Sequence, residues 1–260
     1  MNWVISDRMT PDKKIYFVTD AHLGMRTDVP VAENEKKLVR WLSSIQAGCG
    51  ALYMLGDMID FWYEYKEAVP KGFVRFFGKL AEFTDAGIPV YWFAGNHDLW
   101  LFNYVQQEMG IVVYREAQEL EILGKRFYMA HGDGLGYAPF NLRLMNTIFH
   151  SPFFQALFRL LHPDLGIGFG LKWSRHSYYK RKTMELEYLG EDKEHLVKFA
   201  KEHLANAKTA PDFYIFGHRH ILLDLQLSQD SRLIIPGDWI REFSYASFDG
   251  RDFLLEHFEE

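Results

Sequence analysis

The sequence contains one cysteine, Cys49, among its 260 residues. A single cysteine excludes an intramolecular disulfide and a thiolate metal cage, and we interpret Cys49 as a small buried residue of a protein in a reducing compartment. The chain also lacks any run of 18 consecutive apolar residues, and its first residues lack the uninterrupted apolar stretch of a signal peptide. These absences together predict a cytoplasmic protein.

Positive charge is scarce relative to negative charge. Lysine and arginine total 29 against 35 aspartate and glutamate residues, a formal net charge of −6. This balance excludes a general affinity for nucleic acid, so any anion site must be local. With 48% hydrophobic and 25% charged residues the composition is that of a globular protein, and the length predicts a single domain over residues 1–260.

Short β-rich runs that end in glycine, aspartate, histidine or asparagine recur along the chain. We predict buried strands with polar ends at 15–22, 51–57, 89–98, 126–133 and 212–220. Apolar residues at helical spacing lie between the first three runs, at 38–45 and 73–83. This alternation predicts an α/β fold. Shorter runs at 233–239, 245–249 and 253–258 predict added strands that close a second sheet. The whole is then a two-sheet sandwich flanked by helices.

Residues 137–182 interrupt the strand pattern and carry seven lysine and arginine residues against one acidic residue, Asp164. Their apolar residues recur at helical spacing, as in Phe154, Leu157 and Leu161. The pattern predicts a basic, amphipathic helical insertion within the domain. Two interpretations are open: a helical subdomain docked on the core, or a lid that holds a ligand with an anionic head and apolar tails or contacts a membrane surface. We refer to residues 137–182 as the lid.

The ends of the five predicted strands carry side chains that can bind metal ions. Strand ends on one edge of an α/β sheet converge, and residues i and i+2 of an extended strand point to the same side. Oxygen and imidazole donors without sulfur suit Mn²⁺, Fe or Zn²⁺ in an open, water-containing site, which indicates catalysis. The candidates are Asp20, His22, Asp57, Asp60, Asn96, His97, Asp98, His131, Asp133, His218 and His220.

Each candidate also has a structural interpretation. A lone aspartate after a strand is commonly a turn former or helix cap, and a lone histidine is commonly a hydrogen-bonded residue. We keep this interpretation, as turn residues or residues that support ligands, for Asp60, Asp133, Asp224 and Asp238. We assign no metal to the remaining histidines, His150, His162, His176, His195, His203 and His257.

The five blocks, in order, resemble the signature of the calcineurin-like metallophosphoesterases. The blocks are Asp20-x-His22, Gly56-Asp57-x-x-Asp60, Gly95-Asn96-His97-Asp98, His131-Gly132-Asp133 and Gly217-His218-Arg219-His220. The resemblance covers residues 14–134 and 211–260, and it implies a four-layer β-sandwich flanked by helices. It also implies two Mn²⁺ ions, with Fe or Zn²⁺ as alternatives, the first held by Asp20, His22, Asp57 and His220 and the second by Asp57, Asn96, His131 and His218.

This resemblance implies hydrolysis of a phosphate ester with the help of two metal ions. Two neighbouring ions lower the pKa of a bridging water and neutralise phosphoryl oxygens, so we expect hydroxide attack without a phospho-enzyme. His97 is predicted to be catalytic, facing the phosphate to stabilise transition-state charge or to protonate the leaving oxygen. Asp98 is predicted to fix the tautomer or orientation of His97.

The lid resembles that of the UDP-2,3-diacylglucosamine diphosphatases of lipid A biosynthesis, notably in the rhythm from Asn146 to Phe158. That family cleaves its acylated substrate at the α-phosphorus, releasing UMP and 2,3-diacylglucosamine 1-phosphate with Mn²⁺. The resemblance implies an enzyme without an obligate protein partner, placed peripherally on the cytoplasmic face of a bacterial inner membrane. It implies substrate contacts from Asn96, Lys172, Arg175, Ser177 and Arg181.

Two positions depart from that diphosphatase pattern: His97 stands where arginine is usual, and Arg219 stands where threonine is usual. A second hypothesis is therefore a dinuclear-metal phosphodiesterase or phosphatase for another lipid-linked or nucleotide diphosphate. A third is a scaffold on the same fold. The scaffold is disfavoured because every ligand position holds a competent group, which a scaffold does not need.

Overall fold

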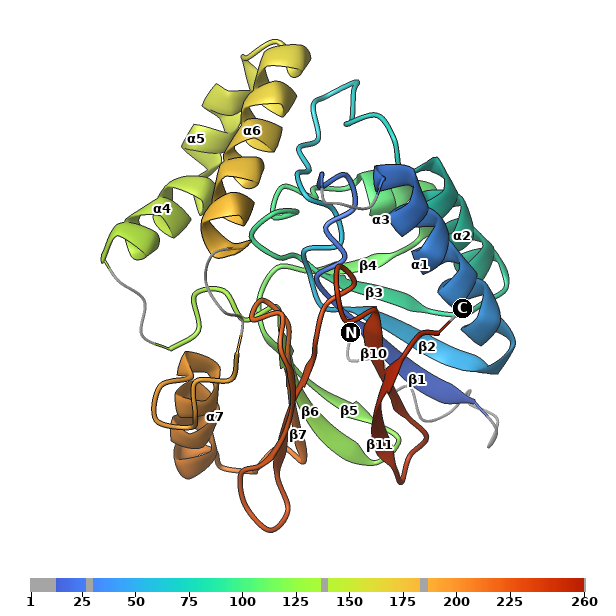
Figure 1. Cartoon of the computed structure of the whole chain (residues 1–260), viewed down its shortest axis with the longest axis vertical. Helices are drawn as coiled ribbons and strands as arrows, with labels where there is room; N and C mark the ends of the chain where they lie inside the picture. The colour runs from blue at the N-terminus through green and yellow to red at the C-terminus, as the bar shows by residue number, and fades with distance from the viewer. Residues whose placement is uncertain (1–12, 27–29, 137–139, 183–186, 260) are drawn as a thin grey trace.

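The computed structural model describes residues 13–26, 30–136, 140–182 and 187–259, and for 140–143 and 175–182 it describes the backbone alone. Two β-sheets pack face to face and helices cover their outer faces (Figure 1). The first sheet has six strands in the order β11-β10-β1-β2-β3-β4, and the second has five in the order β5-β6-β7-β9-β8.

The first sheet is parallel from β1 to its edge strand β4. Its parallel strands are β1 (Lys14–Val18), β2 (Cys49–Met54), β3 (Val90–Phe93) and β4 (Val112–Tyr114). All six residues of β2 are buried, as expected for a parallel strand covered on both faces. Cys49 is among them, so its interpretation as a small buried residue is confirmed.

The sequence predicts that the C-terminal runs all join the second sheet, but two of them do not. β10 (Ser244–Phe248) pairs antiparallel with β1, and β11 (Phe253–His257) extends the same edge of the first sheet. The expectation is wrong for these two strands because β1 lacks a partner on that side and the returning chain supplies one. The second sheet is made of β5 (Gln118–Ile122), β6 (Lys125–Ala130), β7 (Phe213–Phe216), β8 (Leu222–Gln226) and β9 (Arg232–Pro236).

Three apolar cores separate four layers. One core lies between the first sheet and α1 (Val31–Ile45) and α2 (Val74–Asp85), a second lies between the two sheets, and a third lies between the second sheet and α7 (His195–Asn206). The helix α1 buries Leu38, Trp41, Leu42 and Ile45, the predicted apolar face. The four-layer α/β architecture is therefore confirmed. A 3₁₀ turn (Gln46–Gly48) and the short helix α3 (Tyr104–Met109) complete this part of the chain.

Three helices occupy the lid: α4 (Phe140–His150), α5 (Pro152–Arg159) and α6 (Pro163–Lys182). They stand together at the upper left of Figure 1, apart from α1 and α2. A Cβ atom at Gly170 would collide with the Phe61 ring, so this glycine allows α6 to pack closely on the loop after β2. Nowhere in the described ranges does a helix combine the length and the apolar character needed to cross a membrane.

Candidate dinuclear metal centre

The candidate ligands lie in loops that turn sharply just after the strands. Asp20 and His22 follow β1 with φ angles of 52° and 41°, and Asp57 follows β2 with φ 52°. His218 and His220 follow β7 with φ 69° and 53°. Left-handed backbone is uncommon for residues other than glycine and clusters at functional sites. The predicted strands therefore end before their ligands, and left-handed turns replace the expected alternation of an extended strand.

Glycines of the motifs permit a close approach between the loops. A Cβ atom at Gly56 would lie 2.6 Å from His131 Nδ1, and one at Gly95 would collide with the Asp57 carboxylate. A Cβ atom at Gly217 would lie 2.8 Å from Asp20 Oδ2. These positions hold glycine because the backbone of one loop packs directly on a ligand of another.

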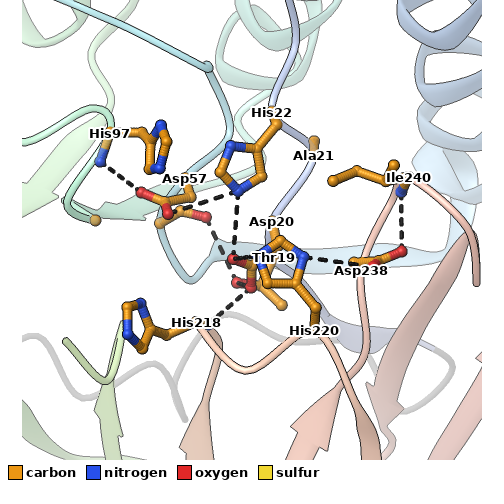
Figure 2. Close-up of polar contacts among 12 residues, drawn as sticks. Thr19, Asp20, Ala21, His22, Asp57, His97, His218, His220, Asp238 and Ile240 are labelled. Carbon is orange, nitrogen blue, oxygen red and sulfur yellow. Dashed lines mark hydrogen bonds and ion pairs between the residues drawn. The ribbon is translucent and has the colours of Figure 1, made fainter. Parts of the chain in front are cut away.

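One group of ligands is formed by Asp20, His22 and His220 (Figure 2). The Asp20 Oδ1 atom lies 3.7 Å from His22 Nε2 and 3.3 Å from His220 Nε2. The Asp57 Oδ2 atom lies 3.6 Å from the same His22 nitrogen. All four side chains are buried. Their donor atoms thus face one small space from three loops.

A second group is formed by Asp57, His131 and His218. The Asp57 Oδ2 atom lies 3.3 Å from His131 Nε2, so a single carboxylate oxygen borders both groups. The side-chain oxygen of Asn96 is buried without a hydrogen-bond partner in the loop after β3. The arrangement places Asp57 between the two groups, where the family resemblance expects a bridging ligand.

The donor atoms of both groups fit metal ions. The buried atoms without a hydrogen-bond partner include Asp20 Oδ1, His22 Nε2, Asp57 Oδ2, His131 Nε2 and His218 Nδ1. Buried polar atoms normally have a hydrogen-bond partner, so buried unpaired atoms that face one another indicate a bound group such as a metal ion. Two ligands of one ion, each about 2.1 Å from it, lie about 3.0–3.4 Å apart. The observed separations of 3.3–3.7 Å are close to that range.

Neighbouring groups hold the ligands in orientation. The second oxygen of Asp20 accepts hydrogen bonds from Thr19 Oγ1 at 2.7 Å and from His218 N at 2.8 Å. His131 Nδ1 donates to the Leu55 carbonyl at 2.7 Å, which leaves Nε2, the nitrogen that faces Asp57, as the one that can bind a metal ion once it is unprotonated. His220 Nδ1 lies 3.4 Å from Asp238 Oδ2. Such supports fix the tautomer of a metal-binding histidine.

Burial and mutual attraction shift the pKa values of these ligands in opposite directions. Burial alone lowers the pKa of His22, but Asp20 and Asp60 outweigh it and raise the pKa to about 10. Burial raises the pKa of Asp57, but His131 and His97 hold it well below its ordinary value. The pKa of His131 is raised well above its ordinary value by Asp57, against the effect of burial. Carboxylates and imidazoles therefore stabilise each other's charged forms in the protein without metal.

A family description, "Calcineurin-like phosphoesterase", matches residues 13–222. The chain belongs to the calcineurin-like phosphoesterase family. It is 42% identical over 258 residues to a UDP-2,3-diacylglucosamine hydrolase of Porphyromonas gingivalis, with 95% of this chain and 98% of the relative covered. A UDP-2,3-diacylglucosamine hydrolase of Escherichia coli O157:H7 is 24% identical over 93% of this chain and 98% of the relative. A solved dimetal phosphatase from Danio rerio is 12% identical, with a TM-score of 0.43 and 96% and 100% coverage of the two chains.

In this phosphoesterase, His97 takes its orientation from Asp60. His97 Nδ1 lies 2.8 Å from the Asp60 backbone carbonyl, which can only accept, so this nitrogen donates. Burial lowers the pKa of the His97 ring, against the attraction of Asp57. The His97 backbone N–H donates to Asp57 Oδ1 at 2.8 Å, which ties the loop to the shared carboxylate.

Asp98 has a different task from the predicted one. Its carboxylate accepts hydrogen bonds from the backbone N–H groups of Gly95 and Met58 at 2.7 and 2.8 Å, and from Trp92 Nε1 at 3.1 Å. These contacts join the β2 and β3 loops, so the expectation that Asp98 orients the His97 ring is corrected. Burial and the nearby Asp57 raise the pKa of Asp98 to about 6.

Two residues lie behind the ligands: Asp60, which the sequence analysis interprets as a turn residue or a support for ligands, and Ser174, which it does not name. Asp60, interpreted as a turn or supporting residue, lies 3.4 Å from His22 Nδ1 and 3.6 Å from His97 Nδ1 through its Oδ1 atom. Ser174 of the lid donates to the same oxygen at 2.6 Å. The Asp57-x-x-Asp60 block indicated Asp60 from the sequence, whereas no local pattern distinguishes Ser174 from other lid residues.

The predicted substrate contacts are spread over the site and the lid. Asn96 lies in the loop after β3, next to His97, whose backbone N–H donates to Asp57, whereas Lys172 is exposed on α6. The side chains of Arg175, Ser177 and Arg181 lie outside the described residues. A cavity of about 310 Å³ adjoins His131 and is lined by the ends of β3, β4 and β6 and by Asn146 and His150 of α4.

Proposed function

We propose that this phosphoesterase hydrolyses UDP-2,3-diacylglucosamine to UMP and 2,3-diacylglucosamine 1-phosphate by attack of hydroxide on the α-phosphorus. The observation that carries the proposal is the 42% identity to the P. gingivalis UDP-2,3-diacylglucosamine hydrolase. Because that match covers 95% of the chain, it includes most of the lid as well as the five metal-ligand loops. The lid is the part of the chain best placed to select a substrate.

The proposed metal ligands are the two groups that share Asp57. Asp20, His22, Asp57 and His220 would hold one ion, and Asp57, Asn96, His131 and His218 the other; we propose Mn²⁺, with Fe or Zn²⁺ also suited to these donors. When bound, the two ions supply a water of lowered pKa and positive charge for the phosphoryl oxygens. The buried carboxylates and imidazoles contribute fixed positions, since their loops are joined by short hydrogen bonds.

The lid offers apolar surface for acyl chains. Its exposed apolar side chains include Phe153, Leu157, Leu160, Leu161, Leu165, Phe169 and Trp173. Each CH₂ group of an acyl chain that leaves water contributes about 0.8 kcal/mol, so a chain of ordinary length gains several kcal/mol on such a surface. Basic side chains of the lid, Lys172 among them, suit the diphosphate.

Turnover of UDP-2,3-diacylglucosamine tests the proposed function directly. Purified protein is stripped of metal and assayed in mild detergent with and without Mn²⁺, following UMP release. We expect Mn²⁺-dependent UMP formation. If this substrate is untouched while a simple phosphodiester is cleaved, the proposed substrate is wrong, and the second hypothesis, an enzyme for another diphosphate, takes its place.

Replacement of His97 by alanine is expected to lower kcat roughly 10²-fold, in line with the loss of a general acid or charge-stabilising group. Both ions should be retained, because the two proposed ligand sets do not include His97. Metal content is measured by elemental analysis beside the kinetics, and His162→Ala, at an exposed lid histidine, serves as the control. Full turnover by the His97→Ala variant with both ions bound would refute its catalytic role.

We also propose that the lid binds peripherally to the cytoplasmic face of the bacterial inner membrane, where an acylated substrate resides. Leu160 and Leu165 are 81% and 68% exposed, and burying each side chain contributes up to about 2 kcal/mol. We expect Leu160→Ser with Leu165→Ser to lower binding to anionic lipid vesicles at least about tenfold. Val74→Ser, an exposed apolar position outside the lid, is the control. Absence of the wild-type protein from vesicles at both low and high salt would contradict this.

A further inference from the structure

Ser174 is buried on the face of α6 that packs against the rest of the domain, like Gly170 one helical turn before it. Its neighbours Lys172 and Trp173 are exposed, whereas Ser174 retains only 3% of its accessible surface. Its hydroxyl donates to Asp60 Oδ1 at 2.6 Å and lies 3.4 Å from His97 Nδ1. This hydroxyl therefore joins the lid to the centre of the site.

Asp60 connects that hydroxyl to two functional histidines. The carboxylate oxygen that accepts from Ser174 lies 3.4 Å from the Nδ1 atom of His22, a proposed metal ligand. The backbone carbonyl of the same residue accepts from His97 Nδ1 at 2.8 Å. Asp60 is 3% exposed, so its carboxylate has little freedom to find other partners in water.

We propose that Ser174 is a positioning residue, which fixes Asp60 and through it the rings of His97 and His22. Docking of the lid and final placement of the catalytic histidine are then one event. The hydroxyl is suited to this task because it donates to a carboxylate without carrying charge, and so leaves the carboxylate able to attract both imidazoles. The inference rests on the proposed function only for the identity of the natural substrate. The expected effects on the metal ions and on a small diester do not depend on it.

The competing explanation is that Ser174 only anchors the lid. An anchor would affect substrates that contact the lid and would leave small substrates unchanged. A positioning residue would affect every phosphodiester, because His97 is proposed to face the phosphate and His22 to hold a metal ion that binds it. A small diester such as bis(p-nitrophenyl) phosphate, which has no acyl chains, therefore separates the two roles.

The experiment compares Ser174→Ala, Ser174→Thr and the matched control Ser151→Ala, a lid serine whose side chain does not cap α5. Kinetics are measured with the small diester and with UDP-2,3-diacylglucosamine, and Mn²⁺ binding to the stripped protein is measured by calorimetry. We expect Ser174→Ala to lower kcat about tenfold on the small diester with KM little changed, and to weaken Mn²⁺ binding several-fold. Ser174→Thr should recover most of both, and Ser151→Ala should resemble the wild type.

Unchanged kcat on the small diester and unchanged Mn²⁺ affinity would overturn the inference, even if KM for the acylated substrate rose. If Ser174→Ala proves unstable in thermal unfolding, Ser174→Cys takes its place in a double-mutant cycle with Asp60→Ala. In that cycle the serine effect should vanish once the carboxylate is gone, and additive losses would overturn the inference. Failure to cleave UDP-2,3-diacylglucosamine would refute the proposed substrate alone, because the small-diester and calorimetric results do not depend on it.

Discussion

Asp57→Asn is expected to reduce hydrolysis by roughly 10³-fold or more, the largest effect we expect of any single substitution. One oxygen of Asp57 lies 3.6 Å from His22 Nε2 and 3.3 Å from His131 Nε2, so it serves both ligand groups. Asparagine keeps the shape of the side chain and can still accept from the His97 backbone N–H at Oδ1. It loses the negative charge that a shared position between two cations requires.

The measurement for Asp57→Asn combines turnover of a simple phosphodiester with the number of Mn²⁺ ions bound per chain. We expect that number to fall below two. Asp224→Asn is the matched control, because Asp224 is a partly exposed carboxylate paired with Arg232 on β9. Two tightly bound ions together with near-normal turnover in Asp57→Asn would rule out a bridging role for this carboxylate.

Metal affinity is expected to rise steeply with pH. In the protein without metal, the pKa of His22 is about 10 and that of His131 is well above its ordinary value, so both rings hold a second proton at pH 7. A metal ion binds only the unprotonated nitrogen, and binding must release these protons. The apparent affinity should therefore increase roughly tenfold per pH unit for each proton released.

The stability of the metal-free protein should change with pH in the opposite sense. The raised pKa of His22 stabilises the fold fully below its unfolded value of 6.5, and this contribution is lost as pH rises from 6.5 toward 10. The lowered pKa of Asp57 stabilises the fold above its unfolded value of 3.8 and is lost as pH falls through the depressed value. These contributions are thus largest together between about pH 4 and 6.5.

Thermal unfolding with and without Mn²⁺ tests both statements. We expect the gain in Tm on adding Mn²⁺ to grow from pH 6 to pH 9, and calorimetry in buffers of different ionisation enthalpy to show proton release. The doubly substituted protein His22→Gln with His131→Gln provides the control, since its metal-dependent gain should be lost at every pH. A gain in Tm that did not vary with pH would contradict the pairing of these histidines with Asp20 and Asp57.

Much of the site could be predicted because its chemistry is written in short motifs. Asp20 and His22, or His218 and His220, are two residues apart, and local spacing of this kind survives any packing of the rest of the chain. The apolar face of α1, with Leu38, Trp41 and Leu42, was likewise readable from its period. The way in which the ligands converge could not be predicted, since left-handed turns rather than extended strands bring them together.

Contacts between distant segments could not be predicted. The Asp98 carboxylate was expected to orient His97, but its hydrogen bonds come from Gly95, Met58 and Trp92. Strands β10 and β11 join the first sheet. This could not be predicted, because the residue pattern of a strand does not indicate which sheet it extends. Which edge they complete depends on where the chain returns after β9.

By itself, the amino-acid sequence determined the kind of chemistry: oxygen and imidazole donors at the ends of buried strands, with no sulfur and a basic, apolar lid. Only the tertiary structure decided which donors share a space, which carboxylate borders both groups, and that Ser174 reaches Asp60 across 114 positions of the chain. The physical reason is range. Donor type and helical or strand period are local properties, whereas ligand grouping arises from sheet register and loop packing between segments that the sequence separates.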